Sequence, residues 1–118
     1  MARPKVVAVD LDDTILHDEF PGMGKPIDGM REQLQAVREL GWKIAIWTVR
    51  NEDKEVAERL KKYQIPFDFI NENPYGPPNG SRKIYADLYL DNRALTFDGN
   101  TKNLARKIVE FKPWNRNG

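Results

Sequence analysis

The chain has 118 residues, of which 40% are hydrophobic and 31% charged, a balance typical of one folded, water-soluble domain. Its net charge of +1 creates no strong attraction to nucleic acid or membranes, and its lack of cysteine excludes disulfides, thiol nucleophiles and cysteine-bound metals. With a single histidine, His17, any metal site must rest mainly on carboxylates. All apolar runs are too short for a membrane span or signal peptide, so we expect a cytoplasmic protein without membrane partners.

Strand-like and helix-like segments alternate from the start of the chain. Val6–Val9 is an apolar, β-branched run typical of a strand buried on both faces. Residues 16–26 are rich in proline and glycine, which predicts a turn-rich loop rather than a regular element. From Ile27 to Leu40 apolar residues recur at helical spacing, and Gly41 follows where helices commonly end.

The alternation continues in the second half. Lys43–Thr48 predicts a second buried strand, and Asn51 is placed to cap the helix after it. A third, short strand is expected at Pro66–Ile70, followed by a loop at Asn71–Ser81 that is rich in asparagine, proline and glycine. The last expected elements are a fourth strand at Asp87–Asp91, a fifth at Leu95–Phe97, a helix at Thr101–Phe111 and a fraying tail at 113–118.

This order of elements predicts an α/β fold. We expect a Rossmann-like three-layer sandwich, in which helices cover a central, mainly parallel sheet. A single domain is expected over residues 1–112, because no connection is long enough to form a separate cap domain. Sheets of this kind bind ligands at the carboxyl ends of their strands. The residues that end the strands are therefore the candidates for function.

Acids and phosphate-binding residue types end the predicted strands. Asp10 and Asp12 follow the first strand, and Asp91 ends the fourth. Carboxylate oxygens suit Mg²⁺, and a cation would screen both the acids from one another and a carboxylate from a phosphate dianion. Thr48 would add a hydrogen-bond donor and Lys83 a positive charge. Asp12 can face the same site as Asp10 only if the first strand ends near Leu11, because alternate strand residues would otherwise fix its direction.

These residues resemble the motifs of the haloacid-dehalogenase superfamily of phosphohydrolases. The family's first motif, an apolar strand followed by Asp-x-Asp-x-Thr, is matched at every defined position from Asp10 to Thr14. A Thr closing strand two, a Lys before the last metal strand and an acid ending that strand are matched, in family order, by Thr48, Lys83 and Asp91. The resemblance covers residues 6–92 and implies that Asp10 is phosphorylated, while Asp12 protonates the leaving oxygen and then activates water.

The resemblance also implies a Mg²⁺ ion held by Asp10, Asp12 and Asp91. The family often has a second acid where this chain has Asn92, so we expect weaker metal binding but not a loss of activity. The short connections after strands one and three resemble the capless bacterial and phage-type members, as does the arrangement of residues 81–93. An open site of this kind implies large or exposed phosphoesters as substrates, or a lid borrowed from a partner subunit.

Residues beside the motifs carry further expectations. Substrate-contacting or supporting roles are open to Thr14, His17, Val49, Arg50 and Asn92. Arg50 is placed to reach the phosphate or the leaving group, whereas a lone loop histidine is more often simply exposed. We expect Asp13 to be a solvated or helix-capping acid and Asp87 to have a structural role. The tryptophans expected to pack in the core or on the surface, rather than to stack on bases, are Trp42, Trp47 and Trp114.

The sequence thus predicts a Mg²⁺-dependent phosphomonoester hydrolase with an aspartyl-phosphate intermediate. One alternative is a family member that binds phosphate without catalysis, although the retention of Asp10 and Asp12 argues against it. A receiver-type phosphoacceptor domain would carry its phosphorylated Asp at the end of strand three, where this chain has Asn71. A mutase or a nucleic-acid-end phosphatase would use the same site, but the near-neutral charge does not favour nucleic acid. The phosphorylated substrate and the oligomeric state stay undetermined.

Overall fold

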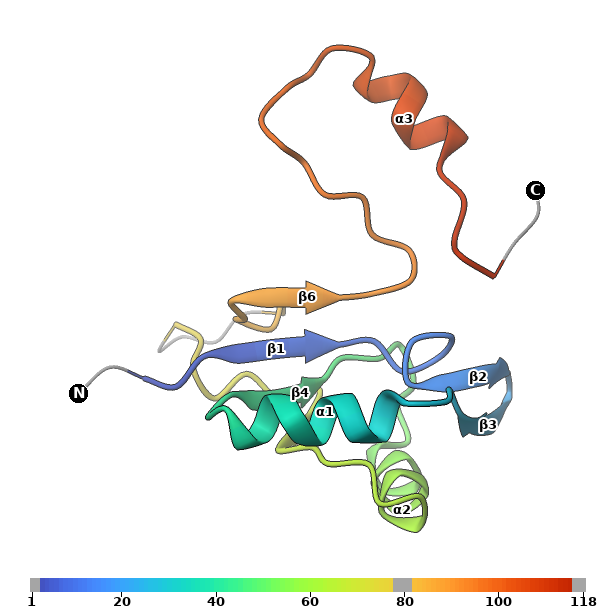
Figure 1. The fold of residues 1–118 in the computed structure, drawn as a ribbon, viewed down its shortest axis with the longest axis vertical. Coiled ribbons are helices and arrows are strands. Elements are labelled where there is room, and N and C mark those ends of the chain that lie inside the picture. Colours follow the sequence, from blue (N-terminus) through green and yellow to red (C-terminus); the bar gives the residue numbers. More distant parts are fainter. Residues whose placement is uncertain (1–2, 78–81, 116–118) are drawn as a thin grey trace.

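The computed structural model describes residues 3–77 and 82–115, and its centre is a four-stranded parallel sheet (Figure 1). The strand order is β5-β4-β1-β6. β1 (Val6–Val9) pairs with β4 (Lys43–Ile46) on one side and with β6 (Leu88–Leu90) on the other, and β5 (Phe69–Ile70) pairs with β4. The predicted α/β fold with a parallel sheet is confirmed, and the described residues form no cap domain.

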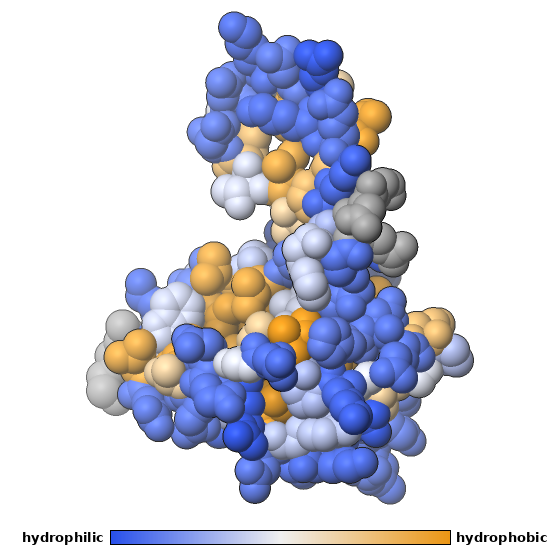
Figure 2. All heavy atoms as spheres, turned by 45° about the vertical axis from the view of Figure 1, so that its right-hand side comes forward, coloured by the Kyte–Doolittle hydropathy of each residue, from blue (hydrophilic) through white to orange (hydrophobic). Residues whose placement is uncertain are grey.

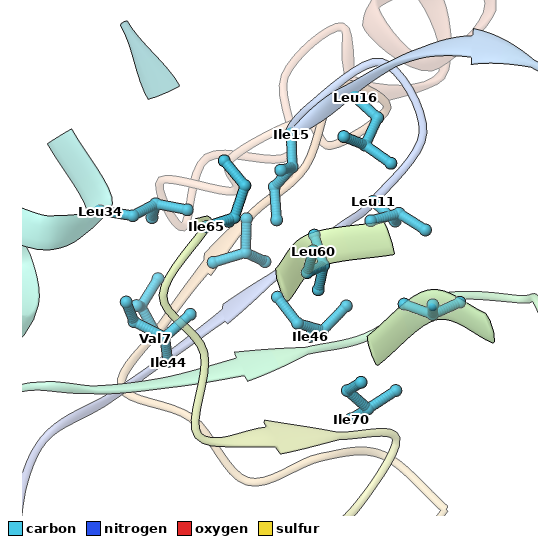
Figure 3. Packing of buried hydrophobic residues seen from close by; sticks show 12 residues of the cluster. Val7, Leu11, Ile15, Leu16, Leu34, Ile44, Ile46, Leu60, Ile65 and Ile70 are labelled. Atoms are coloured by element: carbon cyan, nitrogen blue, oxygen red, sulfur yellow. The ribbon is translucent and has the colours of Figure 1, made fainter. Parts of the chain in front are cut away.

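Two helices cover one face of this sheet. α1 (Met30–Glu39) connects β1 to β4, after the hairpin that follows β1, and α2 (Asp53–Lys62) connects β4 to β5. Each helix turns an apolar stripe toward the strands, and burial of these stripes is the main force that holds the layers together. The core cluster between helices and sheet comprises Val7, Val9, Leu11, Ile15, Leu16, Leu34, Ile44, Ile46, Val56, Leu60, Ile65 and Ile70 (Figure 3).

The opposite face of the sheet is packed by the connection between β5 and β6, which in its described part contains no helix. Ile84 of this connection is buried against Val6, Ala8 and Ala45, with Tyr75 packed beside it. The molecule therefore has three layers, with helices on one face of the sheet and an irregular segment on the other.

Residues 16–26 form a β-hairpin, so the predicted loop is wrong. β2 (Leu16–Glu19) pairs antiparallel with β3 (Gly22–Pro26). The glycine content misled the prediction, because Gly24 does not break its strand. A Cβ at Gly24 would clash with the backbone carbonyl of His17, so this glycine allows the two strands to approach closely.

Several predicted boundaries are also wrong. α1 begins at Met30 rather than Ile27, because the chain first turns through Gly29 with φ +85°. The N-cap of α2 is Glu52, one residue after the predicted Asn51, and it makes no side-chain capping hydrogen bond. The end of α1 is as predicted, since Gly41 adopts the left-handed conformation with φ +94°.

The C-terminal segment departs most from expectation. No fifth strand forms at 95–97, and α3 (Leu104–Glu110) is shorter than the predicted helix and has no buried residue. Figure 1 shows α3 held away from the sheet at the end of an extended connection. The chain then returns to the body, where the Trp114 indole Nε1–H donates to the Asp13 carbonyl (2.9 Å). Residues 116–118 of the predicted tail lie outside the described residues.

Candidate active site

The end of β1 ties Asp10 to the neighbouring strand. The Asp10 backbone N–H donates to the Leu90 carbonyl (2.9 Å), which continues the pairing with β6. The Thr14 hydroxyl donates to Asp10 Oδ2 (3.2 Å) and accepts from the Asn92 backbone N–H (3.2 Å). Thr14 therefore links the segment after β1 to the segment after β6 and fixes one oxygen of Asp10.

A tight reversal follows Asp10, and Asp12 lies within it. The backbone N–H groups of Ile15 and Leu16 both donate to the Leu11 carbonyl (2.9 and 3.0 Å). Because β1 ends at Val9, strand alternation no longer sets the direction of Asp12, and the condition for both acids to serve one site is met.

Asp13 is buried, so its expected role as a solvated or helix-capping acid is wrong. Its backbone is left-handed with φ 61°, a conformation that Asp tolerates better than most residues. Oδ1 accepts from the Asp18 backbone N–H (2.9 Å) and Oδ2 from the Asn115 amide (2.6 Å). Asp13 thus connects the reversal to the hairpin and to the C-terminal tail.

Asp87 has the structural role expected of it, since its Oδ2 accepts from the Val6 backbone N–H (2.8 Å).

Asp10 carries the only large carboxyl pKa shift resolved among the described residues. Burial, reinforced by the negative charge of Asp91, raises the pKa of Asp10 to about 6, although the Thr14 hydrogen bond lowers it in part. With its nitrogen oriented toward the acids, the Asn92 amide donates to Asp10 Oδ2 (3.0 Å) and Asp91 Oδ1 (3.3 Å). Asn92 therefore bridges the two carboxylates without adding a third charge.

The raised pKa of Asp10 predicts a stability change that can be measured without any substrate. In the folded protein Asp10 binds its proton more tightly than in the unfolded chain, where the pKa is near 3.8. Its contribution to stability is therefore complete below about pH 4 and is lost as the pH rises through 6. The shift corresponds to at most about 3 kcal/mol, and solvent screening of this half-buried group reduces our expectation to about 1–2 kcal/mol.

We therefore expect Asp10→Asn to stabilise the metal-free protein by about 1–2 kcal/mol at pH 7.5 and to have little effect near pH 4. Urea unfolding at the two pH values measures this difference. Glu58→Gln, at an exposed position on α2, is the matched control and should change neither value. If Asp10→Asn and the unmodified chain are equally stable at pH 7.5, the ionised Asp10 carboxylate does not destabilise the fold, which would contradict the raised pKa.

Arg50 holds Asp12 through two parallel hydrogen bonds. Arg50 Nε and Nη2 donate to Asp12 Oδ2 and Oδ1, both at 2.9 Å, in the bidentate geometry that Arg forms with carboxylates. Nη1 donates to the Pro21 carbonyl (2.8 Å) and Nη2 to the Gly22 carbonyl (2.7 Å), while the guanidinium lies 5.0 Å from the Phe20 ring centre. The Arg50 side chain is only 1% exposed. It therefore joins Asp12 to the turn of the hairpin, and little of it is left to meet a substrate.

Two pockets meet at Asp10 and Asp91. The first, of 300 Å³, also contains Asp12, whose oxygens keep lone pairs that Arg50 does not use. Its other linings include Phe20, Val49, Asn92 and Arg93. The second, of 490 Å³, contains Lys83, whose Nζ lies 4.9 Å from the Tyr89 ring centre. Trp47 lines it too, with its ring centre 5.7 Å from that of Tyr89.

Thr48 and His17 line neither of these pockets, whereas Val49 lines the first. The Thr48 hydroxyl accepts from the Arg50 backbone N–H (3.1 Å), and the Thr48 backbone N–H donates to Asn71 Oδ1 (2.9 Å). Asn71 thereby fixes the end of β4. His17 is exposed on β2 and lines neither pocket. Val49, which is 90% exposed, lies at the edge of the first pocket.

Three pocket residues were missed from the sequence. Tyr89 lies between Leu88 and Leu90 on β6, so its side chain faces the other side of the sheet from theirs. The alternation of side chains along a strand could have predicted this direction. Arg93 follows the end of β6, where its backbone N–H donates to Asp91 Oδ1 (2.8 Å), and it lines the first pocket. Phe20 had no signal, because its position depends on the unpredicted hairpin.

Asp10 and Asp91 are the residues that could hold a Mg²⁺ ion. Among the described residues, no group of three or more His, Asp or Glu side chains is arranged to hold a metal. The Asp12 carboxylate is bound by Arg50, and its part in the three-carboxylate set expected from the sequence stays a prediction. Mg²⁺ is, however, commonly held by one or two carboxylates together with waters and phosphate oxygens. Burial and then the charge of Asp91 raise the pKa of Asp10, and such an ion would relieve the repulsion between the two carboxylates.

The fold and this arrangement define an α/β protein with a polar site at the carboxyl ends of a parallel sheet. No protein-family model matches the chain, and no curated protein matches it. A solved structure of a conserved protein from Bacteroides thetaiotaomicron is similar, with 26% identity, 95% of each chain covered and a TM-score of 0.70. A protein from Vibrio cholerae matches with 24% identity over 90% of this chain and 98% of its own, with a TM-score of 0.48. No helix of the described part of the chain is long and apolar enough to cross a membrane.

Proposed function

We propose that this protein is a Mg²⁺-dependent phosphomonoester hydrolase of the haloacid-dehalogenase type, with Asp10 as the nucleophile. The observation that carries the proposal is the position of Asp10 at the junction of two pockets, with Asp12 and Asp91 in one and Lys83 in the other. Residues of three family motifs, Asp10, Lys83 and Asp91, line these pockets and support the proposal. Thr48, of the remaining motif, accepts a hydrogen bond from the backbone of Arg50, whose side chain binds Asp12. The fold shared with the Bacteroides protein is compatible with this activity, but the similarity by itself indicates no particular activity.

The proposed reaction has two steps. An Asp10 oxygen attacks phosphorus, the bond to the leaving oxygen breaks, and Asp12 gives that oxygen a proton. Asp12 then takes a proton from water, which attacks the phosphorus of the aspartyl-phosphate, releases inorganic phosphate and regenerates Asp10. Lys83 neutralises charge on the transferred group. Asp10 and Asp91 would hold Mg²⁺, which when bound screens the carboxylate from the phosphate dianion.

The substrate we propose is a phosphorylated small molecule or an exposed phosphoester. The pockets of 300 and 490 Å³ are open to solvent on a body without a cap in its described residues, so a protruding phosphate can enter. The near-neutral chain gives nucleic acid no electrostatic advantage. A cytoplasmic location is part of the proposal, because a chain without cysteine needs no oxidising compartment.

The proposal is tested by hydrolysis of p-nitrophenyl phosphate with and without metal. We expect turnover with Mg²⁺, a loss of at least about 100-fold on chelation, and recovery when excess Mg²⁺ is added back. Glu58→Gln, purified in the same way, should behave like the unmodified chain and shows whether the handling itself alters the rate. Metal-independent turnover, or no turnover of p-nitrophenyl phosphate and a panel of phosphorylated metabolites, would contradict the proposal.

A further inference from the structure

An apolar groove lies open between α1 and β6. It has a volume of 320 Å³, and its lining includes Leu34, Val37, Leu40, Trp42, Leu88 and Leu90. Leu88 and Leu90 are in register with Val7 and Val9, so they face the same side of the sheet as the helical layer. α1 does not reach over them, and Leu88 is 55% exposed. The helical layer is therefore incomplete over the edge strand of the sheet.

α3 presents the complementary surface. Leu104 and Ile108 lie four residues apart on one face of α3, Phe111 follows directly after the helix, and Ile108 is 60% exposed. On the polar side, Arg106 pairs with Glu110 (3.3 Å). Figure 2 shows this segment as a separate lobe above the body, with hydrophobic residues on the side of the lobe that faces the body. An amphipathic helix with no buried residue has an apolar face without a partner.

Both ends of the α3 segment are attached to the body at the edge where β1 and β6 end. The segment leaves β6 after Leu90 and returns at Trp114, which lines a hollow together with Ile27, Met30 and the same Leu90. Leu90 lines both this hollow and the groove, so Trp114 lies beside the end of the groove at Leu90, while the part with Leu40 and Trp42 stays open. To reach this part in its own chain, α3 would require residues 91–103 to reverse along β6, whereas a helix from another molecule can enter directly.

We propose that α3 of one copy docks in the groove between α1 and β6 of a second copy, and that the contact is reciprocal. One twofold arrangement then covers both grooves and both helices, because each chain carries one of each surface. The extended connection at 91–103 lets the helix be exchanged without a change in the sheet. This connection also starts at Asp91 and lines the second pocket through Leu95. The exchange would therefore fix the position of a segment that lines the candidate active site.

The mass in solution and surface variants test the exchange. We expect light scattering to give about twice the chain mass of 13.7 kDa. Ile108→Asp on α3 and Leu88→Asp in the groove should each shift the mass to that of a monomer. Because both side chains are more than half exposed, circular dichroism should show both variants folded. Arg106→Ala, on the polar side of α3, is the matched control and should remain a dimer. A monomeric unmodified chain, or a dimer that both Asp variants leave intact, would overturn the proposal.

Disulfide trapping identifies the chain that supplies the helix. The protein has no cysteine, so a chain with Leu88→Cys and a differently tagged chain with Ile108→Cys contain one thiol each. After co-expression and oxidation we expect a disulfide-linked pair that contains both tags. If α3 instead docks in its own groove, only a chain with both substitutions will form a disulfide, within one molecule. That result would overturn the exchange. Docking of an unrelated partner predicts no disulfide in either experiment and would overturn it too.

Discussion

Replacing Asp10 with asparagine is expected to abolish the hydrolysis of an aryl phosphate in the presence of Mg²⁺. The amide keeps the size and position of the carboxyl group but has no anionic oxygen to attack phosphorus. Loss of a nucleophile typically lowers kcat by several orders of magnitude, and we expect a decrease of at least about 10³-fold. Measurement of kcat/KM at saturating Mg²⁺ tests this, with Glu58→Gln prepared in parallel. A variant that keeps more than about a tenth of the activity would exclude Asp10 as the nucleophile.

Asp12→Asn separates the two chemical steps of the same scheme. With a substrate whose leaving group needs no proton, such as p-nitrophenyl phosphate, attack by Asp10 should still proceed while hydrolysis of the aspartyl-phosphate slows. Acid quenching followed by mass spectrometry should then find phosphate on Asp10. The double variant Asp10→Asn/Asp12→Asn is the control and should carry none. Failure to trap phosphate in Asp12→Asn would argue for direct attack of water and against a covalent intermediate.

The two effects expected of Asp10→Asn have opposite signs, and this contrast is informative. Burial and the charge of Asp91 raise the pKa of Asp10, which makes the ionised carboxylate costly in the metal-free protein. A purely structural site could remove that cost by exchanging Asp for Asn, and position 92 shows that an amide fits beside both acids. A substitution that stabilises the fold and removes activity is the usual sign of a functional group held at the expense of stability.

The sheet could be predicted because its signals are local. β1 and β4 are continuous apolar runs, and a strand buried on both faces needs such a run. The position of Asp10 follows from the same signal, since an acid that directly follows a buried strand must lie at the edge of the sheet. The burial of Asp13 does not follow, because it depends on a left-handed turn and on contacts with the distant hairpin and tail.

The C-terminal helix shows a second limit of prediction from sequence. Its periodicity predicts that an apolar face exists and which residues form it, but not the surface that covers this face. In the structure Ile108 is exposed and the groove at Leu88 is open, although the predicted fold has its helices covering the sheet. Hydrophobic periodicity is a property of one segment, whereas packing depends on two surfaces. The second surface can belong to another molecule.

Arg50 provides the clearest case in which the structure changes the interpretation of a residue. The sequence places it two residues after Thr48 and favours a contact with the substrate's phosphate. The structure joins it to Asp12, 38 residues earlier, and to two hairpin carbonyls, with the side chain 1% exposed. Such a pairing has no local signal. It makes Arg50 a positioning residue for Asp12, and the two interpretations predict different results.

Arg50→Met should therefore lower both stability and kcat. The substitution removes the donors of Asp12, Pro21 and Gly22, and unpaired groups in a partly buried pair cost roughly 3 kcal/mol in unfolding free energy. Arg50→Lys keeps the charge but cannot form the fork, so we expect an intermediate loss. Since Asp12 loses its orientation, kcat should fall about 10- to 100-fold with KM little changed. Urea unfolding and steady-state kinetics measure the two effects.

Two comparisons distinguish this positioning role from direct phosphate binding. Arg93→Met removes an exposed arginine that lines the same pocket and should leave stability within about 0.5 kcal/mol. In the double variant Arg50→Met/Asp12→Asn the losses in kcat should be clearly less than additive, because both substitutions remove the same interaction. If Arg50 instead binds the substrate's phosphate, Arg50→Met will raise KM while stability stays unchanged, and the two losses will add. Additive losses together with a raised KM would show that Arg50 binds the substrate's phosphate and that other groups orient Asp12.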